Sequence, residues 1–202
     1  MQKTALALAL LLAATGARAS EIDSAAAAMA GTEAAFTQRF TPKGFQKSRV
    51  ESGSVIFGTL PNMRWTYSIP EEKLFVFDGT HSWFYVPADK QVTVATVDDQ
   101  RKSEIPFLLI GDDAARARLF NVTESSSGGN VVVRLQPRSA SAAVRDVVLT
   151  IAPSTHLIEQ LEYEDRQGNS TVFDFSDYRH RAVSADLFHF TPPAGVDVVS
   201  TP

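Results

Sequence analysis

The stretch LFVFDGTHSWFYV, residues 74–86, decides the fold. Its Asp78-Gly79 pair is a strong hairpin signal, because glycine tolerates the backbone angles that tight turns between antiparallel strands require. If the loop has an even number of residues, Phe75 and Phe77 share a face with Phe84, and an odd number exchanges these partners. Both faces are apolar in either case. A sheet with one wet face would alternate apolar and polar residues, so we expect both sides of this hairpin to be covered.

Strand patterns continue on both sides of the hairpin. Residues 63–69 place Met63, Trp65 and Tyr67 on one face and polar side chains, including Arg64, on the other, which is typical of a half-buried strand. Further strands separated by Gly, Pro and Asn turns are predicted at residues 91–97, 131–135, 147–151, 157–163 and 171–175, with closing strands at 188–190 and 196–199. No linker or shift in composition divides residues 20–202, so they are expected to form one domain.

The stretch before the strands has a helical pattern. Large apolar residues recur between residues 22 and 40 at spacings near the helical period: Ile22, Met29, Phe36 and Phe40. This pattern predicts one amphipathic helix over residues 22–40 that buries one face against a larger element.

A second helical segment, residues 103–120, interrupts the strands. Pro106 suits the first turn of a helix, and Asp112 or Asp113 can cap the start of another. The segment therefore predicts two short helices inserted into an otherwise antiparallel sheet.

The N-terminus is typical of an export signal. Lys3 precedes an apolar run from Ala5 to Ala14, and Ala17-Arg18-Ala19 is a small-x-small cleavage site. The run is shorter than the ~20 residues that span a bilayer. We expect residues 1–19 to be removed as a signal peptide, leaving a soluble periplasmic protein.

Charge and cysteine content exclude several functions. Without the signal the chain has 17 Lys and Arg against 23 Asp and Glu, a formal charge of −6. This acidity argues against a nucleic-acid partner and against polybasic attraction to an anionic membrane. The chain has no cysteine, so it has no thiolate chemistry, and Ser20 stands where a lipoprotein would carry its lipidated cysteine.

Catalytic and metal-binding patterns are weak throughout the sequence. The four histidines, at positions 81, 156, 180 and 189, lack metal-ligand spacing, and the Asp98-Asp99 and Asp112-Asp113 pairs lack the pattern of a calcium loop. Residues 125–129 form a serine- and glycine-rich stretch without the Lys-Ser/Thr of a phosphate loop, and no G-x-S-x-G elbow occurs. We therefore expect neither an enzyme nor a bound cofactor.

Four segments, in order, resemble the outer-membrane lipoprotein carrier family, the LolA-type periplasmic chaperones. They are Phe36-Thr37-Gln38-Arg39-Phe40, the run from Pro61 to Pro87 with its RW-x-Y, DG and W-x-Y-x-P pieces, Ile105-Pro106-Phe107-Leu108-Leu109, and the ending from Phe188 to Val198. The resemblance covers nearly the whole chain after residue 19. Periodicity alone fits a plain sheet whose aromatic residues fill a solid core equally well.

The resemblance implies a mainly β fold with helices (α+β), an unclosed antiparallel β half-barrel with a helical lid enclosing an apolar cavity. It places Phe36 and Phe40 of the first helix, Met63 and Trp65 of the floor, and residues of the lid around this cavity. The expected lipid-binding residues are Phe36, Phe40, Met63, Trp65, Tyr67, Trp83, Tyr85, Phe107, Leu108 and Ile110.

The function implied is that of a periplasmic carrier that shields the acyl chains of lipoproteins between the inner and outer membranes. Its partners would be acylated lipoproteins, an inner-membrane release complex and an outer-membrane receptor, and a monomer is expected because no coiled-coil seam is visible. One stretch departs from the family, since residues 58–61 lack the basic residue tied there to one-way release. A carrier of another lipid or glycolipid and a lipoprotein-sensing regulatory module therefore stay as alternatives.

Overall fold

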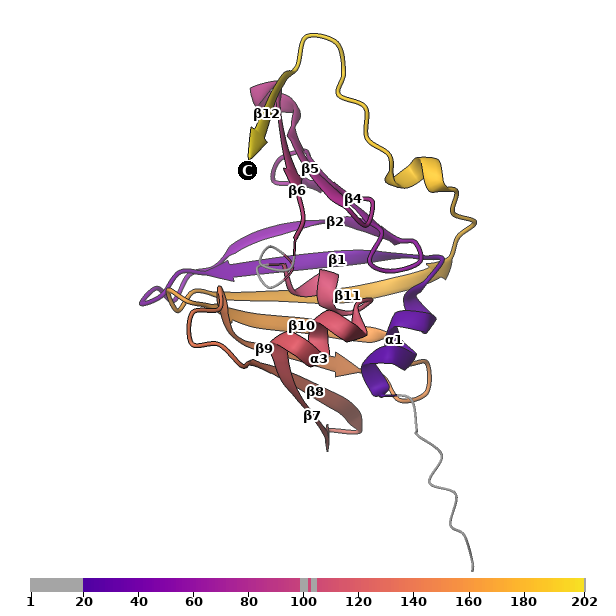
Figure 1. The fold of residues 1–202 in the computed structure, drawn as a ribbon, viewed down its shortest axis with the longest axis vertical. Helices are drawn as coiled ribbons and strands as arrows, with labels where there is room; N and C mark the ends of the chain where they lie inside the picture. The colour runs from indigo at the N-terminus through magenta and orange to yellow at the C-terminus, as the bar shows by residue number, and fades with distance from the viewer. Residues whose placement is uncertain (1–19, 99–101, 103–104, 202) are drawn as a thin grey trace, which may run out of the picture.

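The structure is a computed structural model that describes residues 20–98, 102 and 105–201, so the predicted signal peptide lies outside the described residues. A single twelve-stranded sheet dominates the fold, and its strand order is β12-β6-β5-β4-β3-β2-β1-β11-β10-β9-β8-β7. The sheet curls around two helices, α1 and α3, which lie against its concave face (Figure 1). We call this side the inner face.

The chain forms two runs of consecutive strands, separated by η2 and α3. Its helices and strands are, in order, α1 (Glu21–Met29), β1 (Thr32–Thr41), β2 (Arg49–Phe57), β3 (Met63–Ile69), β4 (Lys73–Phe77), β5 (His81–Val86), η1 (Pro87–Asp89), β6 (Gln91–Thr96), η2 (Pro106–Leu109), α3 (Asp113–Leu119), β7 (Phe120–Ser127), β8 (Asn130–Pro137), β9 (Val144–Ile151), β10 (Ile158–Asp165), β11 (Ser170–His180), η3 (Ala185–Phe188) and β12 (Asp197–Thr201).

The two edge strands, β7 and β12, are not hydrogen-bonded to each other, so the sheet is an unclosed half-barrel. The predicted fold class is confirmed. One pairing departs from the antiparallel expectation, because β12 runs parallel to β6. The predicted closing strand at residues 188–190 is wrong, since Phe188 ends the 3-10 helix η3 and the next two residues belong to no strand.

The predicted helix over residues 22–40 is also wrong in its second half. Helix α1 ends at Met29, Gly31 adopts a φ of +72°, and β1 begins at Thr32. β1 then pairs with β2 on one side and β11 on the other. Backbone pairing with two neighbours outweighs the weak helical preference of this segment, so Phe36 and Phe40 lie on a strand.

The 74–86 hairpin forms as the sequence predicts, with the even-numbered alternative. Phe75 pairs with Phe84 and Val76 with Trp83, which leaves four residues between the paired Phe77 and Ser82. Phe75 and Phe77 therefore face the inner side, and Trp83 faces the outer side.

The C-terminal segment covers the outer side of this hairpin. The ring of Trp83 lies 6.5 Å from His189, and that of Tyr85 lies 5.7 Å from Phe190. Arg64 donates to the carbonyl of Leu187 at 3.3 Å. The outer apolar face of the hairpin is therefore covered, as expected. On the inner face Phe84 is 40% exposed, so the expectation that both sides are covered is confirmed only in part.

Gly53 of β2 lies between two aromatic residues of the inner face. It pairs with Phe36 of β1 on one side and Tyr67 of β3 on the other, and the two rings meet at 4.9 Å. A Cβ at position 53 would lie 1.9 Å from the carbonyl oxygen of Thr66. The absence of a side chain lets β2 and β3 approach.

We expect Gly53→Ala to lower the free energy of unfolding by ~1–3 kcal/mol, because the added methyl group meets backbone that cannot move without breaking the β2–β3 ladder. Urea unfolding measures this loss. Ser52→Ala on the same strand is the control and should change stability little. Equal stability of the two variants would contradict the close approach.

Candidate apolar cavity

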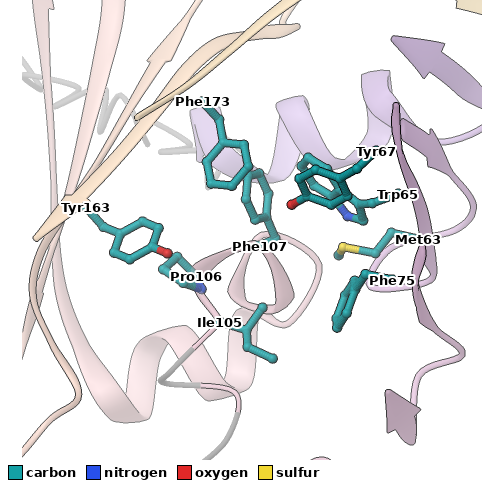
Figure 2. Close-up of a pocket in the computed structure, with 9 residues that line it drawn as sticks. All are labelled: Met63, Trp65, Tyr67, Phe75, Ile105, Pro106, Phe107, Tyr163 and Phe173. Carbon is teal, nitrogen blue, oxygen red and sulfur yellow. The ribbon is translucent and has the colours of Figure 1, made fainter. Parts of the chain in front are cut away.

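An aromatic cluster centred on Trp65 joins the sheet to the segment that covers it. The Trp65 ring lies 4.9 Å from Phe36 of β1, 5.4 Å from Phe173 of β11 and 4.6 Å from Phe107 of η2. The contacts are edge-to-face, the arrangement that aromatic quadrupoles favour. Figure 2 shows that Phe107 reaches the strand residues from the opposite side.

A cavity of about 160 Å³ lies beside this cluster. Its lining side chains are mainly aromatic and aliphatic and come from the sheet and from the segment around η2: Met63, Trp65, Tyr67, Phe75, Ile105, Pro106, Phe107, Tyr163 and Phe173 (Figure 2). The volume is below the ~300–1,000 Å³ of ordinary ligand pockets. The rings are therefore partly packed against one another, with a small hollow between them.

The polar groups of the cavity are uncharged. The Tyr67 hydroxyl donates to Gln38 Oε1 at 2.9 Å. Burial, together with the nearby Glu51 carboxylate, raises the pKa of Tyr67, and burial raises the pKa of Tyr163. Both phenols stay protonated at neutral pH, so the lining offers no charge to water or to a polar ligand.

Four of the predicted cavity residues line it: Met63, Trp65, Tyr67 and Phe107. Phe36 supports them from β1, with its ring against Trp65 and Tyr67. Leu108 and Ile110 are fully buried in the core beside the cavity and do not line it.

Three predicted residues lie elsewhere. Trp83 and Tyr85 are on the outer face against the C-terminal segment, because strand alternation turns them away from Phe75. Phe40 lies near the end of β1, with the Arg49 guanidinium 5.3 Å from its ring centre. Lining residues on distant strands, chiefly Tyr163 and Phe173, were not predicted, because strand alternation was their only signal in the sequence.

The cover over the cavity consists of η2 and α3, and we call residues 105–119 the lid. Pro106 occupies the first turn of η2, as predicted. Asp112 caps α3 by accepting from the Ala115 amide at 2.9 Å, and it also accepts from Lys102 at 2.7 Å. The Lys102 ammonium lowers the pKa of Asp112. The cap thus stays ionised and fixes the start of α3.

A buried arginine holds the two halves of the lid together. Arg116 of α3 is 4% exposed, and its guanidinium donates to the carbonyls of Leu109 and Ile110 at 2.8 Å each. It also forms an ion pair with Asp23 of α1. Arg116 satisfies the carbonyl groups at the end of η2 and ties the lid to α1. This role of Arg116 was not predicted from the sequence.

The lid also rests on the stretch that departs from the family pattern. A Cβ added to Gly111 would lie 2.5 Å from the Leu60 Cβ and 2.6 Å from the Leu60 carbonyl carbon. The junction of η2 and α3 therefore packs directly on the turn at residues 58–61. Apolar contact at Leu60 replaces the charge expected at this turn.

Neither a metal-binding cluster nor a membrane-spanning helix is found in the part of the chain that the structure describes. Within residues 20–98, 102 and 105–201, no group of three or more His, Cys, Asp or Glu could hold a metal ion. The same residues contain no helix with the length and hydropathy needed to cross a membrane.

An open antiparallel sheet curled around an apolar hollow, with a helical cover, defines a half-barrel protein. The family model for the outer membrane lipoprotein carrier protein LolA matches residues 27–191. The chain belongs to this family.

Relatives support the assignment. An outer-membrane lipoprotein carrier protein of Nitrosospira multiformis is 33% identical over 82% of this chain and 80% of its own length. One from Xanthomonas axonopodis pv. citri is 30% identical over 91% of this chain and 88% of its own. Among solved structures, an uncharacterized conserved protein from Thermus thermophilus matches with a TM-score of 0.54 at 13% sequence identity. The match covers 90% of this chain and 97% of that protein's chain, and it supports the fold alone. Family membership supports a lipoprotein carrier role in the periplasm.

We expect Arg116→Ala to lower the free energy of unfolding by ~2–4 kcal/mol, because it removes the guanidinium donor from the buried Leu109 and Ile110 carbonyls and the ion-pair partner from Asp23. The Leu109 carbonyl keeps only the 3.4 Å bond from the Asp112 amide. Urea unfolding checks the magnitude, and hydrogen exchange of residues 107–110 should show the loss localised to the lid. Arg145→Ala is the matched control, since Arg145 pairs with Glu164 while 53% exposed and should cost no more than ~1 kcal/mol. A similar cost for both variants would argue against the buried role.

Proposed function

We propose that this protein carries lipoproteins through the periplasm, from the inner to the outer membrane, by covering their acyl chains in the cavity beneath the lid. The observation that carries the proposal is the uncharged aromatic hollow around Trp65, between the sheet and the lid. Such a site shields apolar chains without directional bonds and without chemistry. The proposal therefore assigns no catalytic role to any residue.

The energetics of acyl chains require such a cover. A triacylated anchor has about 45 methylenes, each worth ~0.8 kcal/mol on burial, so exposing them to water costs on the order of 35 kcal/mol. Non-covalent affinities reach only about −18 to −21 kcal/mol. A carrier therefore covers the chains well enough to delay their escape and still releases them.

Loading requires the lid to move away from the sheet. The present hollow of about 160 Å³ is close to the ~150 Å³ of an engineered cavity that holds a benzene molecule, far less than several acyl chains need. The contacts between lid and sheet are apolar at Phe107 and at Gly111. These two contacts can separate without unpairing a charge, whereas movement of the lid away from α1 would break the Arg116–Asp23 ion pair.

We expect Trp65→Glu to abolish binding of a fluorescent acyl-chain probe, because the carboxylate would be buried without a partner. Titration of the probe measures the loss. Trp83→Glu on the outer face is the matched control and should bind as the unchanged protein does. Phe75→Glu, at a half-buried position of the same lining, should reproduce the loss with less risk to folding. Normal binding by folded Trp65→Glu and Phe75→Glu would refute the cavity assignment.

We expect Gly111→Ala to bind the acyl probe several-fold more tightly and faster. The added methyl group collides with Leu60 and raises the free energy of the closed lid, so less binding free energy is spent on opening it. Ser126→Ala, at an exposed position of β7, serves as control and should bind the probe normally. Slower or weaker binding by Gly111→Ala would contradict a closed lid that opens for cargo.

Identification of the natural cargo separates the carrier from its alternatives. Mass spectrometry of material that co-purifies from the periplasm should find lipoproteins with intact acyl chains. Free glycolipid would instead favour a carrier of another lipid, and an empty protein bound to a membrane regulator would favour a sensing module.

A further inference from the structure

One end of the half-barrel collects cations that are far apart in the sequence. The strand order β2-β1-β11-β10-β9-β8 puts three turns next to one another at this end: residues 42–48, 166–169 and 138–143. In Figure 1 they lie at the left tip of the sheet. The turns carry four basic residues, Lys43, Lys47, Arg166 and Arg138, and contain no Asp or Glu. We call this set of turns the basic end.

The foremost turn of the basic end holds an aromatic ring out in the solvent. Phe45 is 68% exposed, more than any other large hydrophobic residue of the described chain. Its amide donates to the Pro42 carbonyl at 3.0 Å, and the hydroxyls of Thr41 and Ser48 meet at 2.8 Å across the base of the turn. The ring is thus presented by an ordered turn.

The first turn is also fastened to the second. The Lys43 amide donates to Asn169 Oδ1 at 3.0 Å, and Asn169 is itself held by hydrogen bonds with Asp165. A Cβ on Gly168 would lie 2.9 Å from the Lys43 side chain, so the two turns pack closely. Phe45 and Arg166 therefore belong to one fixed surface.

A hollow of about 540 Å³ opens between the second and third turns. Three arginines line it, Arg138, Arg145 and Arg166, together with Ser139. Arg145 also pairs with Glu164 at 2.8 Å, and Arg138 donates to the Ala117 carbonyl at 3.3 Å, so both side chains are oriented. Guanidinium groups match phosphate oxygens in shape and charge.

We infer that the basic end docks on a bilayer that contains anionic phospholipid. Phe45 enters the interfacial layer, Lys43 and Lys47 lie at the level of the phosphates, and the arginine hollow receives a phosphodiester headgroup. An exposed aromatic ring with flanking cations is the usual composition of an interfacial anchor. The inference goes beyond lipoprotein carriage and does not depend on what the cavity holds.

The shape of the basic end favours a bilayer over a protein partner. A stable protein complex buries ~800 Å² per partner over a complementary surface, whereas the tip here is a protruding turn with one apolar ring. The overall charge of −6 after removal of residues 1–19 opposes adhesion of the rest of the molecule to an anionic surface. Contact is therefore confined to the end where the cations gather.

Co-sedimentation with vesicles tests the inference. The protein is purified in the form that the expressing cells produce. Binding is measured on phosphatidylcholine vesicles and on vesicles that also contain phosphatidylglycerol. We expect preferential binding to the anionic vesicles that weakens as salt rises. Phe45→Ser should reduce binding by about tenfold or more, and Lys43→Gln or Arg166→Gln by about fivefold each.

Val122→Ser is the matched control, because Val122 is 39% exposed on β7, outside the three turns, and it should bind vesicles normally. Phe45→Ser should also bind the acyl probe normally, so a failure of docking and a failure of the cavity are distinguishable. The inference is overturned if the protein ignores anionic vesicles or if Phe45→Ser binds them as the unchanged protein does. Saturation of the hollow by inorganic phosphate without any vesicle binding would also overturn it, in favour of a free-anion site.

Discussion

The structure depends on the contact between Trp65 of the sheet and Phe107 of the lid. The two rings meet at 4.6 Å across the side of the cavity, and neither makes the contact through a polar group. Polar bonds instead hold the lid together internally, through Arg116 and Asp112. The lid is therefore a stiff unit on an apolar seat. Such a seat excludes water without directional bonds between the two rings, while polar ties such as the Arg116–Asp23 ion pair to α1 join the lid to the rest of the molecule.

The limits of the sequence prediction are clearest in β1. Phe36 and Phe40 are four residues apart, and four is both close to one helical turn and an even number of strand positions. The periodicity therefore could not separate the two structures, and the alanine-rich start favoured a helix. Pairing with β2 and β11 decides for the strand. By contrast, residues 63–69 alternate apolar and polar side chains and residues 74–86 contain a clear turn signal, and the strands and hairpin predicted there are confirmed.

The cavity residues were predictable only within short range. Alternation linked Met63, Trp65 and Tyr67 correctly, but it could not tell which face of the next hairpin was inner, so Trp83 was assigned to the cavity. Tyr163 reaches the same cavity from β10, although β2, β1 and β11 lie between β3 and β10 in the sheet. That order results from long-range pairing, which leaves no local pattern in the sequence.

The distribution of charge over the surface also depends on long-range strand pairing. A net charge is a sum over the whole chain, whereas a surface depends on which turns the strand order brings together. β10 and β11 carry Tyr163 and Phe173 in the cavity wall, and the turn that joins them carries Arg166. Docking at the basic end would bring this wall close to the bilayer. Acyl chains leave one bilayer and enter another during transfer. The acidic remainder of the molecule would keep that contact weak, and a carrier that must depart again requires a weak contact.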